Sequence, residues 1–312
     1  MRYIIKKVLM MALTLMVVSL CVFLSFNIIP GDPATRRLGT EATPELIQQV
    51  REEMGLNEPL LVRYKDWVVS MVKGDMGTSY SYALPVSSMI ADKIPITVTM
   101  ALMAFALMVI ISIPLGLYTA KHAGGVIDRV IVVLNQIVMA IPPFFSGILL
   151  SLVFGMILKL FTPGAFVSYK TDMKGFINYL IFPAIAIALP KASMCIKLLR
   201  SSVIEEASKD YTRTAYSRGN STNGVLYKHV LKNAMIPVIT FMGMALADMI
   251  AGSIVIEQVF GIPGLSRILM TSISNRDYPV VEAIIMMIAA IVIVTNLLVD
   301  IIYRIVDPRI EE

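Results

Sequence analysis

Long apolar stretches with few or no charged residues are the feature that most constrains this chain. A helix needs about 20 mostly apolar residues to cross the roughly 30 Å hydrocarbon core of a bilayer. Six stretches approach or exceed that length, and we predict them as transmembrane spans: Val8–Ile29, Ile94–Ala120, Val130–Leu158, Tyr179–Leu199, Ile236–Ile256 and Ala283–Tyr303. The sequence therefore predicts an all-α polytopic membrane protein with six transmembrane helices.

The composition supports this class and excludes others. Of the 312 residues, 57% are hydrophobic and 16% are charged, whereas soluble domains have about 45–50% and about 25%. Disordered chains combine low hydrophobicity with high net charge, so disorder is excluded. The net charge of +5 is typical of basic residues gathered on the cytoplasmic side of a membrane. Nucleic-acid binding is not expected, because no basic stripe with interleaved aromatic residues is present.

Two of the apolar runs allow more than one interpretation. A cleavable signal peptide is the alternative for the first run, but its apolar region would be shorter, about 7–15 residues, and end at small residues. The first run instead ends in Pro30-Gly31-Asp32-Pro33, which is typical of a helix stop, so we predict an uncleaved span. The third run contains Pro142-Pro143, which should kink it or divide it into two segments.

Basic residues indicate the orientation of the chain. With six spans both termini share one side, and that side holds fourteen Lys and Arg, against five in the short loops opposite. Cytoplasmic loops are enriched in Lys and Arg, so both termini are predicted to be cytoplasmic. In the long external segment, Thr43-Pro44-Glu45 is typical of a helix start. Leu60–Met71 has helical spacing around Trp67, so two short amphipathic helices are expected on the outer surface.

These observations divide the chain into four parts. Residues 1–30 form an N-terminal transmembrane helix, and residues 31–93 form an external loop with short amphipathic helices. Residues 94–306 form a transmembrane core that contains a cytoplasmic loop, residues 200–235, and residues 307–312 form a cytoplasmic tail.

No pattern typical of an active site is present, so the chain is not expected to be an enzyme or to hold a metal or cofactor. Cys21 and Cys195 both lie inside apolar runs, and with two histidines they give no metal-ligand spacing. The sequence has no Gly-x-x-x-x-Gly-Lys-Ser/Thr phosphate loop, so ATP binding by that device is not expected. Serine-nucleophile and zinc-helix motifs are absent as well.

The connection Leu199–Asn233 is unusually polar for a short loop. Helix-forming stretches flank Gly219-Asn220-Ser221, which combines a glycine typical of a helix end with a serine typical of a helix start. The second stretch has a mixed apolar face made of Val225, Leu226, His229 and Val230. We predict a helix, a sharp turn and a second short helix. From the residues alone, a solvated loop with an excess of positive charge remains the alternative.

At this connection the chain resembles the membrane subunits of ABC-type peptide and nickel importers, and the oligopeptide permease subunit is the most similar branch. Asp210–Gly219, followed by His229–Pro237, looks like the importer "EAA" loop. Arg213-Thr214-Ala215 takes the Glu-Ala-Ala place, and Gly219 takes the place of the family's glycine. Other segments are similar in the same order along the chain: Pro30–Pro33, Gly74–Ser79, Gly252–Leu265, Asn275–Pro279 and Asp300–Arg309.

The resemblance implies a type I ABC importer permease fold in the cell membrane. It implies a second homologous permease subunit, two cytoplasmic ABC ATPase subunits that hydrolyse ATP, and an external substrate-binding protein. Oligopeptides are the implied substrate, with dipeptides and chelated nickel left open. A stand-alone secondary carrier is the alternative from another class, although the internal repeats common in carriers are not found. The residues implied to contact the ATPase are Arg213, Thr214, Ala215, Arg218, Gly219, Lys228 and His229.

Three residues depart from the family pattern. Ser266 stands where the family usually has glycine, which puts the geometry of that outer turn in question. Lys191 and Asp248 are charges deep inside predicted spans, where a charge costs about 2.5–3.5 kcal/mol on insertion scales. We hypothesise that the two side chains point inward, interact, and line or gate the translocation path. Alternatively, Lys191 reaches the cytoplasmic interface and Asp248 hydrogen-bonds a neighbouring helix.

Overall fold

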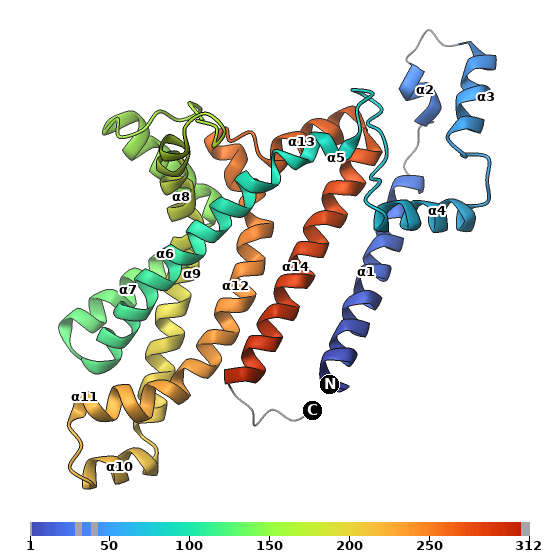
Figure 1. Ribbon diagram of the computed structural model, residues 1–312. Coiled ribbons are helices and arrows are strands. Elements are labelled where there is room, and N and C mark those ends of the chain that lie inside the picture. Colours follow the sequence, from blue (N-terminus) through green and yellow to red (C-terminus); the bar gives the residue numbers. More distant parts are fainter. Residues whose placement is uncertain (1, 29–32, 39–42, 307–312) are drawn as a thin grey trace. The chain divides into compact units, whose positions relative to one another are not determined.

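The computed structural model describes residues 2–28, 33–38 and 43–306 (Figure 1). Within these residues the chain is helical, with one isolated β-bridge between Thr78 and Pro85 and no named strand. Two compact units are present. The first contains Met1–Ile96 and Pro263–Ile293, and the second contains Thr97–Ile262 and Val294–Glu312.

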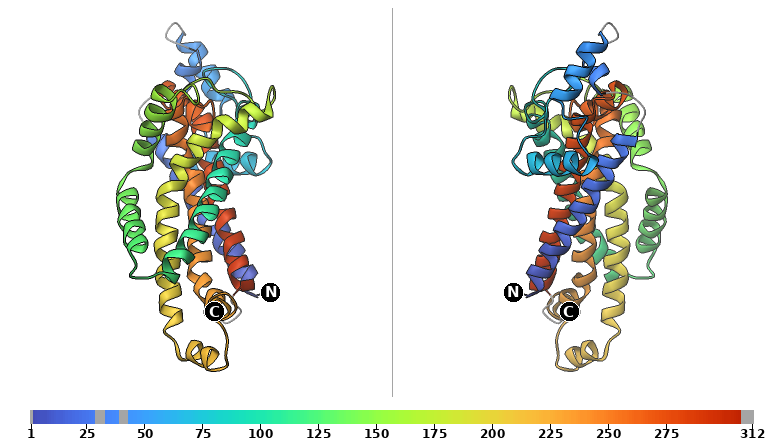
Figure 2. Two further views of the ribbon diagram at one scale, coloured as in Figure 1. Left: turned by 90° about the vertical axis from the view of Figure 1, so that its left-hand side faces the viewer. Right: turned by 90° about the vertical axis from the view of Figure 1, so that its right-hand side faces the viewer.

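The second unit is built around two long helices that pack against each other. Its helices are α6 (Ile94–Lys121), α7 (Val126–Ala140), α8 (Pro143–Leu150), the π-helix η1 (Ser151–Ile157), α9 (Met173–Ala207), α10 (Asp210–Ser217), α11 (Thr222–Val225), the π-helix η2 (Leu226–Val230) and α12 (Leu231–Phe260). The central pair is α9 and α12, and α7 and α8 also pack on α9. Figure 2 shows α10 and α11 at one end of α9.

Small side chains allow this close packing. Ala184, Ala188 and Ala192 recur every fourth residue on α9, and all three are buried. Small residues at this spacing let helix backbones approach each other in membranes. On α12, a Cβ placed on Gly243 would lie 2.0 Å from Val299 of α14, so only glycine fits at that contact.

The first unit contains the remaining helices. These are α1 (Arg2–Ile28), α2 (Pro33–Leu38), α3 (Pro44–Glu53), α4 (Leu60–Val72), α5 (Val86–Ala91), α13 (Leu265–Asn275) and the first part of α14 (Tyr278–Val306). Its buried core joins α5, α13 and α14 through Val86, Ile90, Leu265, Val280, Ala283 and Ile284. The α4 helix packs on α1, where the Phe23 ring lies 5.4 Å from Tyr64 and 5.7 Å from Trp67.

The predicted spans are confirmed as helices, and several of these helices extend beyond the apolar runs. Five described helices are long and apolar enough to cross a membrane, and the bent pair of α7 and α8–η1 makes a sixth if it is one span. That pair bends by 102° at Pro142-Pro143, as the two prolines predict. Helices α9 and α12 extend beyond the apolar runs, because polar helix-forming residues continue them past Leu199 and start α12 before Ile236.

Smaller elements also agree with the sequence. The Thr43 hydroxyl caps α3 by accepting the Leu46 N–H at 3.4 Å, and Pro44 is the first helical residue. The predicted helix around Trp67 is α4. The predicted stop Pro30–Pro33 falls mostly outside the described residues, as does the tail 307–312.

Candidate functional site

The α9–α12 connection has the predicted helix, turn and second helix. Helix α10 ends at Ser217, and Gly219 follows with φ +82°, a conformation that favours glycine. The Ser221 hydroxyl then accepts the Gly224 N–H at 3.2 Å and starts α11. One detail was wrong: the second helix continues as the π-helix η2, and His229 is exposed there while Val225, Leu226 and Val230 are buried. The wider π-turn rotates His229 off the apolar face.

The residues predicted for ATPase contact lie together on this connection. Arg213, Thr214, Arg218, Lys228 and His229 are exposed, whereas Ala215 is buried. Arg213 approaches Asp210 at 3.7 Å, but both side chains are largely exposed. Exposed pairs of this kind contribute little stability, so these charges are available to a partner.

Hydrogen bonds around Glu206 tie the connection to α9 and α12. The Glu206 carboxylate forms an ion pair with Lys209 and accepts the Tyr211 hydroxyl at 2.6 Å. The Asn233 side chain of α12 donates to the same Tyr211 oxygen at 3.2 Å. Burial raises the pKa of Tyr211, and the hydrogen bond to Glu206 raises it further, so the phenol keeps its proton. The sequence analysis missed this network, because it joins residues from three helices.

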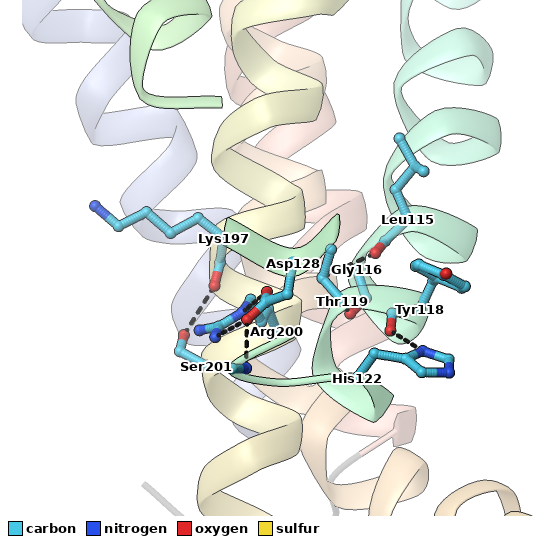
Figure 3. A network of polar contacts seen from close by, with 10 residues as sticks. Leu115, Gly116, Tyr118, Thr119, His122, Asp128, Lys197, Arg200 and Ser201 are labelled. Atoms are coloured by element: carbon cyan, nitrogen blue, oxygen red, sulfur yellow. Dashed lines mark hydrogen bonds and ion pairs between the residues drawn. The ribbon is translucent and has the colours of Figure 1, made fainter. Parts of the chain in front are cut away.

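A second network joins α7 to α9 shortly before the connection begins. The Arg200 guanidinium holds both carboxylate oxygens of Asp128, at 2.6 and 2.8 Å, and Figure 3 shows this two-pronged contact. Asp128 is only 2% exposed and also accepts the Gly124 N–H at 2.8 Å. Sequence reasoning counted Arg200 only as a basic loop residue. The available signal was Asp128, an acidic residue in the first turn of a mostly apolar helix.

Helix α6 contacts α9 at the same level. A Cβ on Gly116 would lie 2.9 Å from Leu199, the residue that precedes Arg200. Figure 3 shows Gly116 and Thr119 of α6, and His122 directly after α6, beside this network. Three helices therefore meet where α9 continues toward the connection.

The predicted contact between Lys191 and Asp248 is present. The Lys191 Nζ lies 2.6 Å from the Asp248 Oδ2, and the side chains are 29% and 67% exposed. The pair joins α9 to α12 well inside both helices, on a face that this chain leaves open. Any role in a translocation path stays a hypothesis.

In the first unit, Asp277 links two of the segments on which the family resemblance rests. Its buried carboxylate accepts the Ser79 hydroxyl at 2.5 Å, the Tyr80 N–H at 2.9 Å and the Ser81 N–H at 3.3 Å. Hydrogen bonds to Asp277 therefore anchor the loop that contains Gly74–Ser79 to the segment Asn275–Pro279. The spacing of these segments in the sequence does not indicate this contact. Ser266 is accommodated in the first turn of α13.

These features define a class of protein: a multi-helix membrane component with a rigidly held, exposed helix–turn–helix connection. The family description "Binding-protein-dependent transport system inner membrane component" matches residues 112–312, and that family's N-terminal model matches residues 1–101. The chain belongs to this family of ABC transporter permeases, which are multi-pass cell-membrane proteins and not themselves catalytic.

Several named permeases match along nearly the whole chain. The chain is 38% identical to the oligopeptide transport system permease protein AppB of Bacillus subtilis over 312 residues, covering 99% of both proteins. It is 34% identical to the glutathione transport system permease protein GsiC of Salmonella choleraesuis, covering 99% of this chain and 98% of GsiC. It is 31% identical to a probable peptide ABC transporter permease, y4tP, of Sinorhizobium fredii, with 99% and 98% covered.

Proposed function

We propose that this chain is the permease subunit of an ATP-driven importer and forms half of a translocation pathway for peptides. The observation that carries this proposal is full-length similarity to permeases named for peptide, oligopeptide and glutathione transport. Oligopeptides are the favoured substrates, since the 38% identical relative is an oligopeptide permease. Dipeptides and chelated nickel are the substrates to compare with them.

Energy for transport comes from partner subunits in this proposal. The sequence has no phosphate loop of its own. We propose two cytoplasmic ABC ATPases, a second homologous permease subunit and an external substrate-binding protein as the partners. Both termini and the α9–α12 connection face the cytoplasm, and residues 31–93 face outward, in line with the excess of Lys and Arg on one side.

The α9–α12 connection is the proposed coupling loop that seats on an ATPase. Its exposed basic side chains supply contact groups, and Gly219 allows the turn between its helices. The Glu206 network and the Asp128–Arg200 pair hold its base to α7, α9 and α12. A rigid-body movement of the ATPases would then move these helices together, as alternating access requires.

The Lys191–Asp248 pair is the proposed polar element of the pathway. Charged residues at membrane depth usually face a cavity or pair with each other. Lys191 and Asp248 pair with each other, and the Asp248 side chain stays mostly exposed. We propose that the exposed side of the pair faces the space enclosed with the second permease subunit. A passing peptide would then meet both charges.

Reconstitution tests the proposed function. The chain, its homologous permease and the two ATPases are placed in liposomes, and uptake of a labelled oligopeptide is measured with binding protein and ATP. We expect uptake that needs all components, and stimulation of ATP hydrolysis by the loaded binding protein. Uptake by this chain alone, driven by an ion gradient, would instead make it a secondary carrier. Parallel assays with a dipeptide and a nickel chelate define the substrate.

A further inference from the structure

A cavity of about 360 Å³ lies within the first unit. Its lining comes from α1, the α3–α4 loop, α4, the segment after α4, and the start of α14. This volume is within the range of about 300–1,000 Å³ that is usual for small-molecule sites. Nothing in the proposed transport function uses this cavity.

Two buried polar side chains of α14 line the cavity. Tyr278 is 7% exposed and Glu282 is 9% exposed. Residues four apart share one face of a helix, so both present themselves on the same side of α14. Among the described residues, the Tyr278 hydroxyl is buried without a hydrogen-bond partner. A buried hydroxyl without a partner is unusual, and a ligand that donates a hydrogen bond would satisfy it.

The charge of the lining favours a cation. Four carboxylates line the cavity, namely Glu58, Asp66, Asp75 and Glu282, and the one basic side chain in this lining is Arg63. Glu58, Asp66 and Asp75 are exposed, whereas Glu282 is buried. Exposed carboxylates at the opening would attract a cation, and the buried carboxylate would hold it. Arg63 acts electrostatically on Glu282 and lies 6.0 Å from the centre of the Phe23 ring.

Aromatic rings complete the lining. Phe23, Phe26, Trp67, Tyr80 and Tyr278 all contribute to it. The Phe26 and Tyr278 rings lie 5.3 Å apart, and the Phe23 and Trp67 rings lie 5.7 Å apart. Aromatic faces attract ammonium groups by the cation–π interaction, most strongly when water is excluded.

We infer that this cavity is a binding site for a small organic cation that carries a primary ammonium group. An ammonium has three N–H donors and no acceptor, which matches the Glu282 carboxylate, the unpartnered Tyr278 oxygen and the aromatic faces. A carboxylate ligand would be repelled by the exposed acidic side chains, whereas an ammonium would give the buried Glu282 carboxylate a charged partner inside the cavity. The site goes beyond the proposed function and does not depend on the direction or substrate of transport.

The only tryptophan of the chain reports on this site directly. Trp67 lines the cavity, so the intrinsic fluorescence of the full-length chain in lipid nanodiscs follows its occupancy. The probe is alanylalanine amide, which has one ammonium and no carboxylate. Its N-acetylated form is the matched control ligand, because acetylation replaces the ammonium with a neutral amide and leaves the rest of the peptide unchanged. Butylammonium is the second probe and separates a general amine site from one that needs a peptide backbone.

We expect a saturable fluorescence change with both amines and none with the acetylated peptide. Glu282→Gln should weaken binding more than about tenfold, because it removes the buried charge. Tyr278→Phe should weaken it about threefold, because it removes one neutral acceptor. Glu52→Gln, on α3 and outside the cavity lining, is the matched control and should bind like the unmodified chain.

Several results would overturn the inference. These are no saturable change with either amine, equal binding of the acetylated peptide, or undiminished binding in Glu282→Gln. If Glu282→Gln does not fold, the comparison of acetylated with free peptide on the unmodified chain still decides the question, and Tyr278→Phe gives a second variant. Binding of the peptide amide without butylammonium would also contradict a site defined by the ammonium group.

Discussion

Gly219 combines a left-handed backbone conformation with open surroundings. Its φ of +82° disfavours any residue with a Cβ, at a cost of roughly 1–2 kcal/mol for the left-handed conformation. Apart from its two chain neighbours, no atom of the described residues lies within 4 Å of where a Cβ would be placed. A large side chain here would therefore clash with a partner and not with the chain itself.

This separation makes Gly219 a sharp test of the proposed coupling loop. Gly219→Ala adds only the backbone cost and should reduce transport several-fold, about what roughly 1–2 kcal/mol predicts. Gly219→Trp adds bulk on the exposed side and should abolish peptide uptake while membrane insertion stays normal. Uptake in proteoliposomes and the amount of assembled complex are measured together. Normal assembly with unchanged transport in Gly219→Trp would favour the solvated-loop interpretation.

The Lys191–Asp248 pair allows a charge-swap test of the pathway hypothesis. Lys191→Asp and Asp248→Lys each replace the ion pair with two like charges at facing positions inside the spans, so each should impair transport at least about tenfold. The double swap restores opposite charges and should recover part of the activity. Lys174→Asp, near the start of the same helix, controls for a new negative charge on α9. Full activity in Asp248→Ala would remove Asp248 from the pathway.

Among the helices, α7 and α9 are joined by an ion pair in which the Asp128 carboxylate is buried and Arg200 is partly exposed. Removing Arg200 would leave the Asp128 carboxylate buried without its cation, and breaking such pairs costs about 3–5 kcal/mol. Because α9 continues directly into the coupling loop, the pair also fixes where that loop begins.

Arg200→Met should therefore lower the thermal unfolding midpoint of the purified chain, by several degrees or more for a loss of this size. Asp128→Leu combined with Arg200→Met should regain most of the loss, because no buried charge remains. Arg213→Met breaks the exposed pair with Asp210 and serves as the control, with a change within about 0.5 kcal/mol. Equal effects of Arg200→Met and Arg213→Met would show that burial of Asp128 is not what stabilises α7 on α9.

Local signals in the sequence predicted the elements well. Apolar length located the spans, Pro142-Pro143 located the bend, and Gly219 with Ser221 located the turn of the coupling loop. The exceptions arise from interactions between elements. The Asp128–Arg200 pair spans 72 residues, and the Glu206 network joins three helices, so no local pattern reports them. The π-helix at Leu226–Val230 also cannot be predicted from hydrophobic periodicity, because that pattern assumes 3.6 residues per turn.

For the molecule as a whole, the family could be predicted from the sequence, whereas the contacts between residues far apart in the chain were found only in the structure. The contact role of the seven coupling-loop residues came from resemblance, and of these residues local patterns singled out only Gly219, as a turn, and His229, on a mixed apolar face. The ammonium site could not be predicted, because Tyr278 and Glu282 meet Trp67 and Phe23 only after about 200 intervening residues have folded.

The whole chain is also expected to be inert toward nucleotide. It has no phosphate loop, so the purified subunit should neither bind nor hydrolyse ATP. Photolabelling with an ATP analogue, at concentrations that label the partner ATPases, is the measurement. The assembled complex serves as the positive control. Labelling of the isolated subunit at those concentrations would contradict the proposal that only the partner ATPases bind and hydrolyse ATP.

The Asp277 anchor imposes an order on biosynthesis. Asp277 lies 198 residues after Ser79, and a ribosome adds about 5–20 residues per second, so the carboxylate is made about 10–40 s after its first partner. During that interval three donors of the Ser79–Ser81 segment lack their acceptor. A nascent chain that stalls before Asp277 should therefore remain open to protease at this segment, long after its first spans have entered the bilayer. Asp277, between the last two helices, thus completes the hydrogen bonds of a loop that the ribosome made much earlier.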